Sequence, residues 1–507
     1  MVDRLHSFTL ADVLRENART HPDGVALVCG DERVTFPELD AEVSRFAGTL
    51  RELGVGAGDR VAWIGYNCHR LVELFYACAK LGAVAAPLNW RLTSQEYDGI
   101  LRSVQPSVVL TSGDAAFDDL NAATRRALPN APLVLHDDPA FHARIAEAPD
   151  TDPANDAHDE LPVLQIMTAA FGGTPLAAQL TSRGIVAQDL VLRAVGLVRP
   201  VEEVYLGAGP MFHIGVLLKL FATVHWGGTN VIVPQADAEE ICRLIEVERC
   251  TSAYVFPPTM RQMVEVSRGG RYDLGSLVDT FGGIAPEDLA EEWYALTSCK
   301  PPAQSGLVGY GTSETVGMVT FEGRPPDSTS PFGRPSPIVA LRIFDPAGDE
   351  VPAGEIGEIA VRGPQVMAGY LGEPPLDPDG WRNTGDLGRR EPDGSVTFLG
   401  PNQEIIKSGM ENIYPVEVET ALRRHDAVRD ACVVGRPDPE WGSSVLAVVE
   451  LEPGADAPSE ADLINFTKTH IASYKKPRQV VFVDALPRNA FGAPDRVAVR
   501  TEHVPLG

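Results

Sequence analysis

Three short glycine-rich segments contain the residues of this chain that are best suited to bind a nucleotide. They are Phe281–Pro286, Gly309–Glu314 and Asn383–Leu387. Glycine lets the backbone approach a flat or anionic ligand closely because it has no side chain. The ring of Tyr310 can stack on a base, Glu314 can bind Mg²⁺ through a carboxylate oxygen, and Asp386 can accept two hydrogen bonds from ribose hydroxyls. Each segment alone is also compatible with a tight turn.

The elements that must position these segments alternate between strands and helices. Apolar runs predict strands at Val61–Ile64, Val84–Pro87, Val108–Leu110, Leu133–Leu135, Asn230–Val233 and Tyr254–Phe256. Apolar residues spaced by three and four positions predict helices at Phe8–Thr20, Thr35–Leu53, Leu71–Lys80 and Ala238–Glu248. Such alternation is typical of parallel or mixed sheets covered by helices. The expected fold class is therefore α/β.

The pattern changes near Pro335 and again near Gly400. A small barrel-like β part is expected from strands at Leu341–Phe344, Gly357–Arg362 and Ser395–Leu399. A small α+β unit then follows, with helices at Pro415–His425 and Ser459–His470 and strands at Val428–Gly435, Ser444–Leu451 and Gln479–Val483. We expect an N-terminal domain over 1–401 and a C-terminal domain over 402–507. Residues 136–161 are rich in Asp, Ala and Pro, which favours a surface loop or linker.

The acidic composition excludes several classes of partner. The 507 residues contain 70 Asp and Glu against 43 Lys and Arg, a formal net charge of −27. Nucleic-acid binders need a basic face and anionic membranes attract Lys and Arg, so neither partner is expected. No uninterrupted apolar stretch predicts a membrane span, and the N-terminus has no signal-peptide pattern. We expect a cytoplasmic protein of more than one domain.

Lysine and cysteine usage narrows the chemistry further. Only seven lysines are present and none follows a glycine, so the chain has no Walker A phosphate loop. Its seven cysteines include no C-x-x-C pair, which argues against a disulfide framework and a structural zinc site.

The ordered series of motifs resembles the adenylate-forming superfamily, and most closely its acyl-CoA synthetases. Besides the three glycine-rich segments, the similar stretches are Val34–Ala62, Pro87–Tyr97, Pro210–Gly215, Gly354–Leu371, Ile406–Glu419 and Tyr474–Val483. The resemblance implies a two-step reaction. A carboxylate first attacks the α-phosphate of ATP to give an acyl-adenylate and pyrophosphate. A mobile C-terminal domain then swings about a hinge, and an acceptor, usually CoA, displaces AMP.

The resemblance also implies roles for individual residues of this chain. Tyr310 stacks on adenine, and the following Gly311, Thr312 and Ser313 also contact the nucleotide. Asp386 holds the ribose, and Glu314 binds Mg²⁺. The other implied contacts are Gly283, Ile284 and Ala285 at the adenine pocket, Thr168 and Ser313 at the phosphates, His213 and Gly311 at the acyl group, and Ser408, Gly409 and Met410 at the acceptor passage. The implied ligands are ATP, Mg²⁺, a small acid and CoA. A homodimer is the assembly compatible with these expectations.

The sequence departs from the family pattern where charge is expected. The phosphate loop has Leu176 in place of a lysine, the hinge segment Gly400–Gln403 lacks an Arg and an Asp, and the C-terminal lysine position is Ala493. A prearranged donor to developing negative charge contributes on the order of 10²–10³ in rate. Arg496 is expected to replace the C-terminal cation, and Arg183 or backbone N–H groups to cover the phosphate loop.

Two other hypotheses remain open from the sequence. The acceptor is an amine, or nitrous acid is activated for diazotisation of an aryl amine, because Met410 narrows a passage that a glycine usually lines. Alternatively, the chain binds nucleotide or an acyl ligand without catalysis.

Overall fold

The protein forms two compact units in a computed structural model. The large unit comprises residues 1–90, 101–168 and 177–399, and the small unit comprises 91–100, 169–176 and 400–507. The structure describes residues 8–153, 157–169, 175–283, 285, 288–301, 309–321, 333–345, 347–377, 380–401, 406–409, 411–413, 415–488 and 494–504. The expected boundary between 401 and 402 stays a prediction, because 402–405 lie outside this described part.

A seven-stranded sheet forms one half of the large unit. Its strand order is β19-β8-β7-β4-β3-β5-β6. The strands are β3 (Arg60–Ile64), β4 (Val84–Pro87), β5 (Val108–Thr111), β6 (Leu133–Leu135), β7 (Pro162–Ala169), β8 (Pro175–Thr181) and β19 (Gly369–Tyr370). The neighbours β4, β3, β5 and β6 pair in parallel, whereas β19 runs antiparallel to β8 at the edge.

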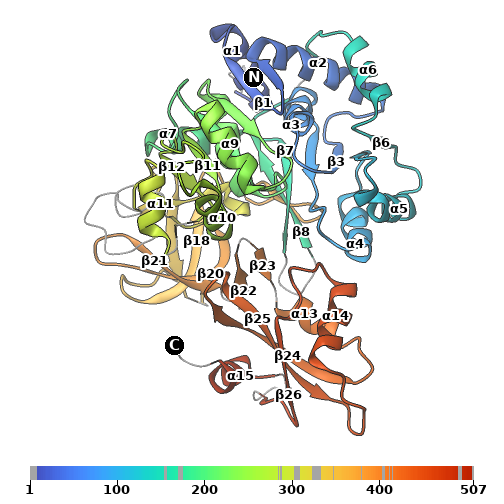
Figure 1. Ribbon diagram of the computed structural model, residues 1–507, viewed down its shortest axis with the longest axis vertical. Coiled ribbons are helices and arrows are strands. Elements are labelled where there is room, and N and C mark those ends of the chain that lie inside the picture. The colour runs from blue at the N-terminus through green and yellow to red at the C-terminus, as the bar shows by residue number, and fades with distance from the viewer. Residues whose placement is uncertain are drawn as a thin grey trace. The chain divides into compact units, whose positions relative to one another are not determined.

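A six-stranded sheet forms the other half, in the order β12-β11-β9-β10-β1-β2. The strands are β1 (Val25–Cys29), β2 (Glu32–Thr35), β9 (Val204–Gly207), β10 (Thr229–Ile232), β11 (Ser252–Tyr254) and β12 (Asp279–Phe281). One buried cluster joins β9, β10 and β11 to three helices, which are drawn in green to yellow-green in Figure 1. These helices are α9 (Ala238–Glu248), α10 (Pro257–Ser267) and α11 (Ala290–Leu296).

Two apolar helices form the core of the large unit. They are α3 (His69–Leu81), which contacts both β4 and β1, and α8 (Ile214–His225). Phe75 of α3 packs edge-on against Phe221 of α8 with ring centroids 5.5 Å apart. Lys80 of α3 is fully buried and donates to Asp40 Oδ1 at 2.6 Å, so its charge is neutralised. The other helices of the large unit include α1 (Leu10–Thr20), α2 (Phe36–Glu52), α5 (Asp118–Ala127) and α7 (Ser182–Ala194), with the 3-10 turn η1 (Ala115–Phe117). Helix α4 (Ser94–Val104) is shared, because its residues up to Ile100 belong to the small unit.

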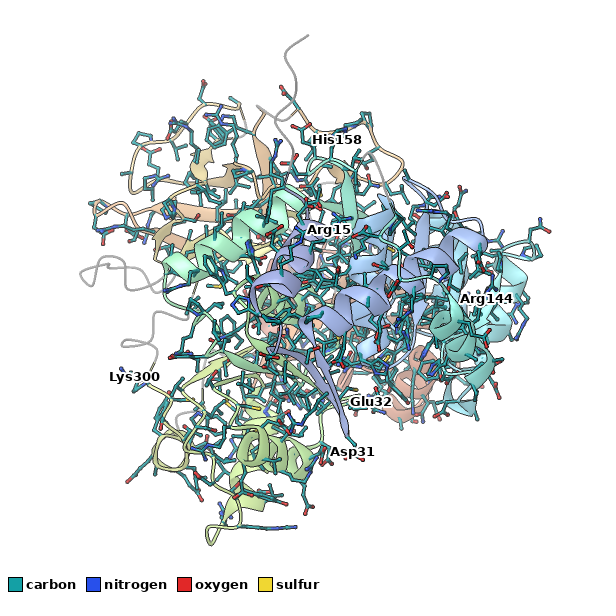
Figure 2. All side chains as sticks on the ribbon, turned by 90° about the horizontal axis from the view of Figure 1, so that it is seen from above. Arg15, Asp31, Glu32, Arg144, His158 and Lys300 are labelled. Carbon is teal, nitrogen blue, oxygen red and sulfur yellow. The ribbon has the colours of Figure 1, made fainter. Side chains whose placement is uncertain are left out.

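The expectation that residues 136–161 form a surface loop or linker is wrong for Pro139–Glu147, which form helix α6. Asp138 caps the helix by accepting from Ala140 N at 2.8 Å, and the proline suits the first helical turn. Phe141 and Ile145, one turn apart, bury an apolar face. Arg144, labelled in Figure 2, donates to Glu52 at 3.0 Å. The following chain is tied to α1 by Arg15, also labelled there, which donates to Asp152 at 2.7 Å.

A four-stranded antiparallel sheet and two small hairpins complete the large unit. The sheet has the order β17-β18-β20-β21. Its strands are β17 (Ala340–Phe344), β18 (Ile356–Arg362), β20 (Arg382–Arg390) and β21 (Val396–Pro401). The hairpins pair β13 (Gly311–Thr312) with β14 (Gly317–Met318) and β15 (Thr320–Phe321) with β16 (Arg334–Pro335), and the 3-10 turn η2 (Ser313–Thr315) lies within the first.

The small unit has its own apolar core beneath a three-stranded sheet of order β24-β25-β26. Its elements are β22 (Ile406–Ser408), β23 (Glu411–Ile413), α13 (Pro415–Leu422), β24 (Val428–Asp438), β25 (Gly442–Leu451), α14 (Glu460–His470), β26 (Gln479–Val483) and α15 (Arg496–His503).

The predicted α/β fold class is therefore confirmed, with mixed sheets, a barrel-like β part and a small C-terminal unit. Most predicted elements lie within a few residues of the observed ones. The strand expected at Tyr254–Phe256 instead lies two residues earlier, because Pro257 begins helix α10. Within the described residues, no helix combines the length and apolar character that crossing a membrane requires.

Candidate functional site

The expected base and ribose residues are directly bonded to each other. Tyr310 precedes the β13–β14 hairpin, Asp386 lies on β20, and the Tyr310 hydroxyl donates to Asp386 Oδ2 at 2.7 Å. The tyrosine is 5% exposed and its ring stacks on Phe398 with centroids 5.3 Å apart. Burial and the Asp386 charge raise the pKa of Tyr310 well above its usual value, so the phenol stays a hydrogen-bond donor.

Local backbone geometry explains why Asp386 takes this position. The pairing of β18 with β20 shifts register between Glu358 and Ala360, and Gly385 has φ of +78°. A bulge of this kind re-aims a side chain. The bulge is held by Thr384 Oγ1, which donates to the Ile359 carbonyl at 2.9 Å.

The β13–β14 hairpin, which follows Tyr310 and contains Glu314, requires a glycine at position 311. A Cβ atom at Gly311 would lie 2.0 Å from the carbonyl oxygen of Gly317, so no other residue fits without moving the hairpin. Thr312 N donates to Thr315 Oγ1 at 2.9 Å, which closes the turn that contains Ser313. Glu314 is the middle residue of this turn, and its carbonyl accepts from Met367 N at 2.8 Å.

Glu314 is held by Tyr370, which is itself bonded to Arg382, and neither residue was expected from the sequence to have a role. The Tyr370 hydroxyl donates to Glu314 Oε1 at 2.8 Å, and Arg382 Nη2 donates to that hydroxyl oxygen at 2.7 Å. Burial and the Glu314 charge raise the pKa of Tyr370. The Glu314 side chain has two oxygens, and Mg²⁺ commonly takes one or two carboxylates and fills its other positions with phosphates and water. Glu314 therefore suits the expected metal. Over the described residues there is no group of three His, Cys, Asp or Glu side chains that could form a metal site.

The expected phosphate contact Thr168 lies on β7, and its hydroxyl could still form a hydrogen bond to a ligand. Oγ1 is buried and has no hydrogen-bond partner among the described residues. An unpaired buried hydroxyl is unfavourable, and an anionic oxygen would satisfy it. Residues 170–174 of the phosphate loop lie outside the described part. Leu176 is on β8, so the position of the missing lysine is apolar. Arg183, the expected replacement, is occupied by Asp159 and Glu160 at 2.9 and 2.8 Å.

The residues expected at the adenine pocket and at the acyl group have defined local contacts. Gly282 has φ of +100°, and a Cβ at Gly283 would lie 2.6 Å from Pro257 Cδ. Ala285 is buried, whereas Ile284 lies outside the described residues. His213 caps helix α8, because its Nδ1 accepts from Gly215 N at 3.1 Å. That bond assigns the proton of a neutral ring to Nε2.

The expected acceptor and C-terminal residues belong to the small unit. Ser408 ends β22, and Gly409 has φ of +61° and donates to the Trp441 carbonyl at 2.7 Å. Met410 and Ala493 lie outside the described part. Arg496, at the start of α15, forms an ion pair with Glu419 and donates to the Val433 carbonyl at 3.1 Å. Its catalytic role stays a prediction, and these partners favour a structural one.

The residues expected at the base, the ribose and Mg²⁺ lie on hydrogen-bonded segments of a large α/β unit, and a separate α+β unit follows. This combination is the one that the resemblance to adenylate-forming enzymes implies. The chain belongs to the AMP-binding enzyme family: the family's pattern matches residues 14–371, and that of the AMP-binding enzyme C-terminal domain matches 417–493. The predicted family and its ligase class are confirmed.

Relatives with different acceptors are similar to this chain over nearly their whole lengths. A fatty acid–[acyl-carrier-protein] ligase of Streptomyces coeruleorubidus is 32% identical, with 97% of this chain and 96% of the relative covered. An indoleacetate–CoA ligase of Aromatoleum aromaticum is 32% identical, with 95% and 96% covered. Among solved structures, the amide bond synthetase McbA of Marinactinospora thermotolerans has a TM-score of 0.82 at 25% identity, with 98% and 100% covered. The o-succinylbenzoate CoA synthetase of Bacillus subtilis has 0.80 at 26%, with 96% and 98% covered.

Proposed function

We propose that this protein is an ATP- and Mg²⁺-dependent ligase that activates a carboxylic acid as an acyl-adenylate and transfers the acyl group to CoA. In the first step a carboxylate oxygen attacks the α-phosphorus, the bond to the bridging oxygen breaks, and pyrophosphate leaves. In the second step the thiol sulfur of CoA attacks the carbonyl carbon, and AMP leaves. A cytoplasmic location is part of this proposal, supported by seven cysteines that are all free thiols.

The observation that supports this function most strongly is that the expected nucleoside contacts, Tyr310 and Asp386, lie close to the expected metal ligand, Glu314. Tyr310 and Glu314 are four residues apart on one segment, and Asp386 lies across from Tyr310 on β20. A nucleoside bound at Tyr310 and Asp386 extends its phosphates toward Glu314, where a metal neutralises them.

The test is release of AMP from ATP with a panel of carboxylic acids, in the presence and absence of CoA. We expect an acyl-CoA product and AMP in equal amounts. The matched variants are Glu314→Gln, which we expect to lose activity, and Glu355→Gln, an exposed glutamate of the same unit that should retain it. A wild-type protein that is stabilised by ATP but forms no AMP would instead be a non-catalytic binder.

An acceptor other than CoA is the second candidate. It is favoured by Met410 in the acceptor segment and by similarity to McbA, which is described as an amide bond synthetase. AMP that forms with a carboxylic acid and an amine, and not with CoA, would support amide formation. AMP that requires nitrite and an aryl amine would support diazotisation.

A further inference from the structure

Arg382 differs from other arginines around the candidate site in what it contacts. It begins β20, is partly buried, and donates to the neutral hydroxyl of Tyr370 at 2.7 Å. Its Cζ atom lies 5.0 Å from the centre of that ring. Within the described part of the chain it forms no ion pair with a carboxylate, and its buried Nε has no hydrogen-bond partner. Arg183, by contrast, is bound to two acidic residues.

Two hydrogen-bonded links connect β20 to the segment that carries Tyr310 and Glu314. The first link is the Tyr310–Asp386 bond, and the second is the chain from Glu314 through Tyr370 to Arg382. Because a strand rises about 3.3 Å per residue, the four positions between Arg382 and Asp386 span on the order of 10 Å. A ribose and its triphosphate extend over a comparable length. A nucleotide bound at the first link therefore directs its terminal phosphates toward the second.

The second link also lies beside the strand that leaves the phosphate loop. Tyr370 pairs with Ala178 of β8, and Leu371 N donates to the Ala177 carbonyl at 2.9 Å. The residue before Ala177 is Leu176, the uncharged position where the family pattern has a lysine. The structure thus brings Tyr370, which accepts from Arg382, next to Ala177 and Ala178, the residues that directly follow this position in the chain.

We infer that Arg382 binds the β- and γ-phosphates of ATP and takes over the role of the missing phosphate-loop cation. This inference rests on the proposed function. A planar guanidinium can donate two parallel hydrogen bonds to a phosphate, and the buried Nε supplies a donor that has no other partner. Arg382 is then a catalytic residue, since negative charge grows on pyrophosphate as the bond to the α-phosphorus breaks. Tyr370 is a positioning residue that fixes both Arg382 and Glu314.

The test compares equilibrium binding of ATP and AMP, measured by calorimetry without Mg²⁺, in the wild type, Arg382→Met and Arg382→Lys. Loss of a charge-assisted contact should weaken ATP binding roughly tenfold and leave AMP affinity unchanged. Lysine should restore part of the loss, because it keeps the charge without the fork. The rate of pyrophosphate–ATP exchange should fall on the order of 10²-fold in Arg382→Met. Arg342→Met is the matched control, because Arg342 is exposed and stacks on Trp381, next to Arg382 in the chain.

Two results would overturn the inference. Equal loss of ATP and AMP binding in Arg382→Met and Arg382→Lys would mean that Arg382 only supports the fold of the site. Unchanged ATP binding, with only an altered Mg²⁺ requirement, would mean that it acts solely on Glu314. Failure of the proposed function is distinguishable from both, because the wild type itself would then show no acid-dependent pyrophosphate–ATP exchange, whatever its affinity for nucleotides.

Discussion

Arg382 of the large unit differs from two basic side chains of the small unit in what it is bonded to. In the small unit, Lys475 donates to Glu417 at 2.6 Å and to Glu96 at 3.1 Å, and Arg496 pairs with Glu419. In the large unit, Arg382 donates to a neutral phenol. A cation that already faces carboxylates contributes to the fold, whereas one that faces a hydroxyl keeps its charge for an anionic ligand. The loss of both family lysines therefore need not remove catalytic charge from the large unit.

The largest effect is expected from Glu314→Ala. Removal of the carboxylate leaves the Tyr370 hydroxyl without its acceptor and, in the proposed function, the metal without its protein ligand. Acid-dependent pyrophosphate–ATP exchange should fall by about 10²–10³-fold, with a melting temperature close to the wild type. Glu355→Ala is the control. Near-normal exchange in Glu314→Ala would mean that the phosphates bind elsewhere. The contrast between Arg382 and the paired cations of the small unit would then have no bearing on catalysis.

Lys475→Met should affect stability rather than chemistry. The substitution leaves Glu96 and Glu417 facing each other in a largely buried position, and breaking such a pair lowers the free energy of unfolding by about 3 kcal/mol. Denaturant unfolding measures this value, and exchange per folded molecule should be unchanged. The neighbouring Lys476→Met is the control, because Lys476 donates to the Ser473 carbonyl. A fall in exchange without a fall in stability would show that this lysine is catalytic.

Arg496→Ala decides whether the small unit supplies a catalytic cation. Glu419 is nearly buried and Arg496 is 25% exposed at its side chain. Loss of the pair should therefore lower the free energy of unfolding by about 1–2 kcal/mol and leave adenylation unchanged. Arg500→Ala, at an exposed position of the same helix, controls for helix effects. Retained stability with a 10²-fold slower adenylation would restore the original hypothesis for Arg496.

The smallest effect is expected from Tyr310→Phe. The ring still stacks on Phe398, but the bond to Asp386 is lost. A single hydrogen bond to a charged group contributes about 1.5 kcal/mol, so KM for ATP should rise roughly tenfold while kcat changes little. Tyr272→Phe is the control, since Tyr272 donates to Glu239 at the surface. A fall in kcat with constant KM would mean that Tyr310 acts on the reacting phosphate.

The sequence predicted the elements well where apolar spacing was strong. Strands β3 to β6 and helices α3 and α9 have clear periodic patterns, and so have the elements of the small unit. Helix α6 was missed because only Phe141 and Ile145 mark its buried face. Its cap, Asp138 followed by a proline, was the signal that could have found it.

The candidate site was predictable residue by residue but not as a set of contacts. The roles expected for Tyr310, Glu314 and Asp386 followed from motif resemblance, and their functional assignment stays a proposal. Tyr370 was inside a quoted motif without a role, and Arg382 was not considered. Tyr370 contacts Glu314, and Arg382 contacts Tyr370, through hydrogen bonds between residues that are far apart in the chain or on different strands. Such contacts leave no local pattern in the sequence.

The close contact at Gly311 limits how this enzyme can be altered. With no room for a side chain, the spacing between Tyr310 and Glu314 is set by backbone geometry alone. Substitution at position 311 would move the base contact and the metal contact relative to each other. Libraries aimed at a new acid substrate should therefore keep this position fixed and vary the residues around His213, which is expected at the acyl group.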